Sequence, residues 1–208
     1  MKGKQILTTA RAVAISEEML SYRREFCADT EFVRMDFVWE ELCVDGGTFN
    51  IRTFRGEQSE DFKPKARVIR FGDNVTLHAD ERLFEDAKNG GKLSNSILAH
   101  EFAHLALDHH SNGVGVKNFQ LFQGPNGMSI LPPNLEEYEA DLGAIFFQCG
   151  VALHDNRWDT IQLAHRAFAD VNLVKKARRI AQLDVFRREL YLQRQKENLR
   201  TRHQCVVF

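Results

Sequence analysis

The chain has 208 residues, of which 28 are lysine or arginine and 29 are aspartate or glutamate, so its formal net charge is -1. This balance excludes a strong overall attraction to nucleic acid or to anionic lipid. The four cysteines (Cys27, Cys43, Cys149 and Cys205) are too widely spaced for a zinc ribbon or a disulfide scaffold. No apolar run reaches the length of a membrane span and the first residues lack the apolar core of a signal peptide, so we expect a cytoplasmic protein with one sizeable core.

The first half of the chain predicts a helix followed by three short strands. Ser16 can cap a helix that reaches Cys27. The extended stretches that follow are residues 50–54, 67–71 and 75–79. Gly72-Asp73-Asn74 separates the last two of them and predicts a hairpin turn.

The next segment carries the most informative motif of the chain. Ser94 or Ser96 can cap a helix whose residues 97–107 are apolar on all sides, so this helix should be buried. Within it, His100-Glu101-Phe102-Ala103-His104 reads His-Glu-x-x-His. Residues four apart share a helix face, so both imidazoles can bind one metal ion, and Glu101 can act as a general base on water held by that metal. A metal would also give these buried polar groups a common partner.

A catalytic site of this kind needs a third protein ligand, and two candidates compete. His110 lies six residues after His104 and matches the last histidine of the pattern His-Glu-x-x-His-x-x-Gly-x-x-His. Leu107 stands where that pattern has glycine, so the helix can continue and would direct His110 away from the metal. Met128 is a poor match to the methionine turn that accompanies the pattern, and we disfavour this candidate.

The second candidate lies on a helix that Asn134 can cap. Glu137 and Asp141 are four residues apart, and the small residues Ala140 and Ala144 lie on or beside the same face. A face of small residues allows close approach to the first helix, so Glu137 could complete the metal site and Asp141 could accept a hydrogen bond from a ligand imidazole. The simpler interpretation of these acids is an ordinary acidic first turn on a solvated face.

With HEFAH at residues 100–104 and EYEAD at residues 137–141, the sequence resembles the gluzincin pattern His-Glu-x-x-His…Glu-x-x-Ala-Asp. The short spacer and small size are similar to those of the ImmA/IrrE-like metallopeptidases, and M48-type peptidases and Lit-type phage-exclusion peptidases have similar motifs. The resemblance covers roughly residues 66–150. Gly143 departs from it, because the ImmA/IrrE-like helix usually has phenylalanine there, and the usual Leu-Leu-Met-Pro ending is also absent.

The resemblance implies an α+β, zincin-like fold with a small antiparallel or mixed sheet and an active-site helix. It implies a zinc-dependent endopeptidase that cleaves a specific cytosolic protein as a regulatory event. By the same resemblance, His100, His104 and Glu137 would bind Zn²⁺, Glu101 would activate the zinc-bound water, and Asp141 would support the ligands.

Some further roles are expected around such a site. In zinc peptidases an edge strand near the active helix binds the substrate backbone, and residues 75–79 are our candidate. His78 and Tyr138 are weaker candidates for stabilising the transition state. The long glycine-rich loop at residues 111–134 is expected to overhang the cleft and shape substrate choice.

We expect residues 1–150 to form the metallopeptidase domain and residues 151–208 to form a helical extension packed on it. Helices are predicted at residues 160–169 and from a cap at Asn172 onward. From there to Arg202 the chain has ten basic and three acidic residues, which favours a solvated face. The alternative is a non-catalytic regulator with a peptidase-like fold that binds DNA or a protein partner through these basic helices.

Overall fold

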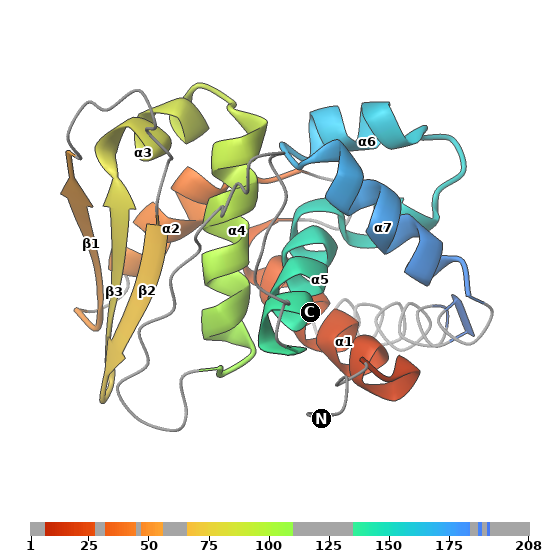
Figure 1. Cartoon of the computed structure of the whole chain (residues 1–208), viewed down its shortest axis with the longest axis horizontal. Coiled ribbons are helices and arrows are strands. Elements are labelled where there is room, and N and C mark those ends of the chain that lie inside the picture. The colour runs from red at the N-terminus through yellow and green to blue at the C-terminus, as the bar shows by residue number, and fades with distance from the viewer. Residues whose placement is uncertain are drawn as a thin grey trace, which may run out of the picture.

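The computed structural model describes residues 7–27, 32–44, 47–55, 66–109, 135–183, 187–188 and 191. Over these ranges the chain is α+β, with seven α-helices and a three-stranded mixed sheet (Figure 1). The elements are α1 (Thr9–Phe26), α2 (Met35–Val44), β1 (Phe49–Phe54), β2 (Ala66–Phe71), β3 (Asn74–Asp80), α3 (Glu81–Lys88), α4 (Lys92–Ala106), α5 (Leu135–Cys149), the 3-10 helix η1 (Gly150–His154), α6 (Thr160–Arg166) and α7 (Val171–Ala181). None of the helices in the described ranges has both the length and the apolar character needed to cross a bilayer.

The sheet has the strand order β1-β3-β2, so β3 is its central strand. β2 and β3 form the predicted antiparallel hairpin around Gly72, whose φ of +58° favours a residue without a side chain. β1 pairs with β3 in parallel from the other side. The prediction that residues 75–79 form an edge strand is therefore wrong, because β1 and β2 occupy both sides of β3.

One face of the sheet faces the core. Ile51, Leu77 and Val68 lie side by side across the three strands. Helices α2, α3 and α4 all contact the sheet and lie on one side of it in Figure 1. Among the strands, β2 is the one against which α4 mainly packs, so this edge of the sheet borders the helix that carries the His-Glu-x-x-His motif.

Helix α4 stands between the sheet and α5 (Figure 1). Every residue from Ser94 to His104 is buried, as the apolar pattern predicted. The helix begins earlier than expected, because Gly91 is its N-cap and neither predicted serine caps it. Ser94 instead donates a hydrogen bond to Asp86 Oδ2 at 2.6 Å, and Ser96 accepts one from the backbone N–H of Asp170 at 2.8 Å.

Phe102, the third residue of the motif, anchors α4 against three other helices. Its ring packs on four aromatic rings with centroid separations of 4.6 to 6.2 Å, which belong to Tyr22, Phe26, Trp39 and Phe147. Aromatic pairs of this kind contribute about 0.5–1.5 kcal/mol each beyond their burial. Phe102 therefore limits rotation of α4 about its axis. This helps to set the direction of His100, Glu101 and His104.

Helix α1 begins at Thr9, behind the cap Thr8, and not at Ser16 as the sequence predicted. The Thr8 hydroxyl accepts a hydrogen bond from the third residue along, whereas Ser16 is buried inside the helix and donates to a carbonyl three residues earlier. The helix is therefore long enough to run beside much of α5.

Arg23 of α1 is buried and holds the C-terminal end of α5. Its guanidinium donates hydrogen bonds to the carbonyl oxygens of Phe147 and Gln148. These carbonyls belong to the last turn of α5 and have no partner within the helix. Gly150 leaves room for the arginine, since a Cβ there would lie 2.5 Å from Arg23 Nε.

The segment after α5 packs on the same core. Buried residues of α6 and α7, such as Leu163 and Val174, belong to one hydrophobic cluster with those of α1 and α4. Helix α7 begins behind the cap Asp170, whose carboxylate accepts two backbone N–H bonds, and not behind Asn172. Most of the predicted basic stretch after residue 183 lies outside the described residues.

Candidate metal centre

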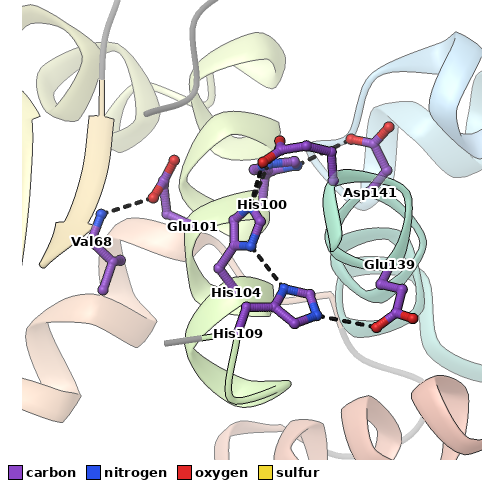
Figure 2. A network of polar contacts seen from close by, with 8 residues as sticks. Val68, His100, Glu101, His104, His109, Glu139 and Asp141 are labelled. Atoms are coloured by element: carbon purple, nitrogen blue, oxygen red, sulfur yellow. Dashed lines mark hydrogen bonds and ion pairs between the residues drawn. The ribbon is translucent and has the colours of Figure 1, made fainter. Parts of the chain in front are cut away.

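Helices α4 and α5 bring two histidines and one glutamate to a single point. The Nε2 atoms of His100 and His104 lie 3.0 Å apart (Figure 2). Glu137 places Oε2 3.1 Å from His100 Nε2 and Oε1 3.5 Å from His104 Nε2. The three side chains that the sequence singled out therefore meet, with one ligand atom from each within 4.8 Å of the others.

The spacing of these atoms suits a divalent metal ion. In a tetrahedral site with bonds of about 2.0–2.1 Å, neighbouring ligand atoms lie about 3.3 Å apart. The two Nε2 atoms are 3.0 Å apart, and the 3.1 and 3.5 Å distances to Glu137 go to its two different oxygens, so all three values fall on either side of that spacing. Two imidazoles and a carboxylate can thus hold a metal ion here with only small adjustments.

The pKa values of the two histidines are shifted in opposite directions. Burial acts to lower the pKa of His100, but its hydrogen bonds to Asp141 and Glu137 outweigh burial and raise that pKa to about 9. Burial lowers the pKa of His104 to about 4. Burial also acts to raise the pKa of Glu137, yet the two imidazoles hold it well below its usual range. These shifts favour a protonated His100 beside a neutral His104 and an ionised Glu137.

Asp141 lies one turn beyond Glu137 and supports His100 from behind. Its Oδ1 is 3.1 Å from His100 Nδ1, the ring nitrogen that does not face the triad (Figure 2). Lys176 of α7 lies 3.7 Å from its other oxygen. A carboxylate at Nδ1 keeps a proton on that nitrogen and leaves Nε2 available for a metal. This is the supporting position that the sequence predicted for Asp141.

Glu101 is fully buried on the side of α4 that faces the sheet. Its Oε2 accepts a hydrogen bond of 2.8 Å from the backbone N–H of Val68 in β2 (Figure 2). That N–H points away from β3 and toward α4, so the edge strand holds the carboxylate in place. Glu101 follows His100 directly in α4. Its carboxylate is oriented by β2, whereas Glu137 comes from α5.

The end of α4 differs from the sequence prediction. The helix stops at Ala106 with Leu107 as its C-cap, and Asp108 adopts a left-handed conformation with φ of 52°. The N–H of His109 then donates to the carbonyl of His104 at 3.0 Å, the longer hydrogen bond of a Schellman turn. The expectation that the helix continues past Leu107 is therefore wrong. The residue after Leu107, Asp108, adopts the left-handed conformation that ends the helix.

His109 is a site residue that sequence reasoning missed. The turn returns its side chain to His104, with 2.8 Å between the two Nδ1 atoms (Figure 2). Its Nε2 lies 3.2 Å from Glu139 Oε2, and Glu139 accepts hydrogen bonds of 3.0 and 2.6 Å from Arg11 of α1. The available signal was Asp108, since aspartate tolerates αL better than most residues.

The remaining predicted residues lie elsewhere. His78 is on β3 opposite Arg52 and Arg67 in the register of the sheet, and burial together with these cations lowers its pKa. Tyr138 is exposed, and the ammonium of Lys176 lies 4.3 Å from its ring centroid. Neither residue has a contact with the triad that would assign it to the chemistry. His110 and Met128 lie outside the described residues.

Comparison of the chain with protein-family models, with curated proteins and with solved structures finds no match. The function of the site is therefore inferred from its geometry and from the chemistry of its side chains.

Proposed function

We propose that this chain is a zinc-dependent endopeptidase of the gluzincin type, with a zincin-like core made of the sheet, α4 and α5. The observation that carries the proposal is the convergence of His100, His104 and Glu137 next to a buried Glu101. Catalytic zinc sites have three protein ligands drawn from such donors and leave one position for water or substrate, whereas structural zinc sites have four protein ligands.

Zinc in this site would supply Lewis acidity that activates water and polarises the peptide carbonyl. Glu101 would accept the proton from the attacking water and deliver it to the leaving amine. The Val68 N–H holds one of its oxygens, which limits rotation of the carboxylate during both transfers. A purely structural metal would need no general base beside it.

We assign to β2 the substrate-aligning role first expected for β3. β2 is the edge strand that contacts α4, and the Val68 N–H points from this edge toward Glu101. In an antiparallel strand, alternate residues direct their backbone groups to the same side, so Ala66 and Arg70 direct theirs to this edge, whereas the Val68 N–H is already engaged by Glu101. An extended peptide added here would pass close to Glu101, which favours a protein or peptide as the substrate.

The proposal is tested by separating metal binding from catalysis. Purified wild type should contain one zinc ion per chain by elemental analysis, and His100→Ala should contain almost none. Glu101→Gln should keep its zinc but cleave a quenched fluorescent peptide library about 10²–10⁴-fold more slowly, because the general base is lost.

Glu85→Gln is a matched control, because Glu85 is an exposed glutamate on α3, a helix that supplies none of the candidate ligands. It should cleave at the wild-type rate. Wild type without zinc would contradict the metal site. A Glu101→Gln variant that binds zinc and cuts as fast as wild type would contradict the assigned base.

A further inference from the structure

The two candidate histidine ligands have different partners at the nitrogen that faces away from the triad. His100 Nδ1 meets the carboxylate of Asp141 directly. His104 Nδ1 meets His109, another imidazole, and the carboxylate of Glu139 follows only behind that ring (Figure 2). An imidazole can donate or accept, so the direction of the hydrogen bond between His104 and His109 depends on which ring nitrogens carry protons.

Glu139 decides that direction. It is buried, and its hydrogen bonds from Arg11 hold its pKa below the usual range, so it is an ionised acceptor. His109 must then carry a proton on Nε2 to donate to Glu139, and in its neutral form, the form that can accept from a metal-bound His104, the ring keeps a lone pair on Nδ1. That lone pair accepts a hydrogen bond from His104 only if His104 carries its proton on Nδ1. His104 Nε2 is thereby left with the lone pair that points at the triad.

We propose that His109, held by Glu139 and Arg11, is a positioning residue that fixes His104 in the tautomer and orientation of a metal ligand. The inference rests on the proposed zinc site, because it assigns a role toward that metal. His109 does not bind the metal itself, since both of its ring nitrogens are already engaged by His104 and Glu139.

The arrangement has a counterpart on the other side of the triad. Asp141 supports His100 and has Lys176 of α7 beside it, whereas Glu139 supports His104 through His109 and is bound by Arg11 of α1. Each outer carboxylate is thus balanced by a cation from a different helix. The ion pair between Arg11 and Glu139 joins residues 128 positions apart and links α1 to the metal ligands.

The experiment measures the affinity of the intact chain for Zn²⁺ and Co²⁺ by competition with a chelator. His109→Ala should weaken both affinities about ten- to a hundredfold, as removal of such outer hydrogen-bond partners does in other metal sites. His109→Asn should restore most of the loss, because its amide oxygen can occupy the place of Nδ1. His109→Gln should not restore it, since its amide lies one bond farther out. His165→Ala, which removes an exposed histidine of α6, should match wild type.

A second readout reports the tautomers directly and does not depend on a variant that folds poorly. In ¹⁵N-histidine spectra of the zinc-loaded wild type, His104 should carry its proton on Nδ1 and His109 on Nε2. The ligand-field spectrum of bound Co²⁺ should also change in His109→Ala and return in His109→Asn.

A His109→Ala variant with wild-type affinity and an unchanged Co²⁺ spectrum would overturn the inference, as would a proton on Nδ1 of His109. Failure of the proposed zinc site would give a different result. Wild type would then bind no zinc, or the His100→Ala variant would bind zinc as tightly as wild type.

Discussion

His100 and His104 lie one turn apart on α4, yet their pKa values of about 9 and about 4 lie on opposite sides of neutrality. Burial acts on both imidazoles, and only His100 has two carboxylates within hydrogen-bond distance, at Asp141 and Glu137. The local environment therefore gives the same side chain two different protonation states. A metal ion must displace the proton on Nε2 of His100 but meets no proton on Nε2 of His104 at neutral pH.

This difference predicts a pH dependence of metal binding. A pKa of about 9 means that a proton competes for His100 Nε2 at lower pH, so the apparent affinity for Zn²⁺ should rise about tenfold per pH unit between pH 7 and 9 and level off above pH 9. Chelator competition at a series of pH values measures this slope. Asp141→Asn should move the plateau to lower pH, because it removes one of the carboxylates that raise the pKa. An affinity that is flat from pH 7 to 9 would contradict the assignment of the proton to His100.

At the scale of elements, the distance between α4 and α5 is decided by small side chains. Gly143 of α5 faces Ala103 of α4, and a Cβ built at Gly143 would lie 3.2 Å from the Cβ of Ala103 and 3.3 Å from side-chain atoms of Leu107 and Met19. Side chains of α1 and α4 fill the space beside this glycine. The sequence predicted a small-residue face from Ala140 and Ala144, and both are indeed buried.

Gly143→Val should therefore separate the two helices that supply the ligands. Overpacking of a close contact costs typically about 1–3 kcal/mol, so the free energy of unfolding should fall by that amount in chemical denaturation. Zinc affinity should fall as well, because Glu137 and Asp141 move with α5. Ala14→Val is the matched control, since Ala14 is exposed on α1 and the change there costs only helix propensity, well under about 1 kcal/mol. Equal effects of the two substitutions would rule out the close contact as the cause.

At the scale of the whole molecule, one hydrophobic cluster joins residues from α1 to α7, and the candidate ligands project from two helices embedded in it. The anchors at both ends of α5, Arg11 on Glu139 and Arg23 on Phe147 and Gln148, come from the first helix of the chain. A ligand that joins α4 to α5 should therefore stabilise the folded chain as a unit.

Metal removal should accordingly lower the thermal stability of the whole chain. Zinc at a free concentration 100 times its Kd contributes about 2.7 kcal/mol to folding, which for a chain of this size raises Tm by roughly 5–10 °C. Calorimetry with and without a chelator measures the change. His100→Ala provides the comparison, and an equal rise in that variant would mean that zinc acts outside the proposed site.

Much of the candidate site could be predicted from the sequence because its spacings are local. Residues four apart on a helix share a face whatever the rest of the chain does, so the pairs His100 with His104 and Glu137 with Asp141 followed from the pattern alone. The hairpin at Gly72 and the burial of α4 from Ser94 to His104 followed for the same reason. Helices α2 and α3 were not predicted, and the starts of α1, α4 and α7 were placed at the wrong caps.

Only the tertiary structure decided the features that depend on contacts between distant segments. β3 became the central strand because β1 adds to it in parallel, and no local pattern specifies which strands pair. The role of His109 depends on an αL turn at Asp108 and on Arg11, which lies 128 residues from the carboxylate that it binds. The sequence by itself determined which side chains could bind a metal, because that follows from helix periodicity. Packing determined how those side chains are held, because the hydrogen bonds behind the ligands come from helices that meet only in the folded chain.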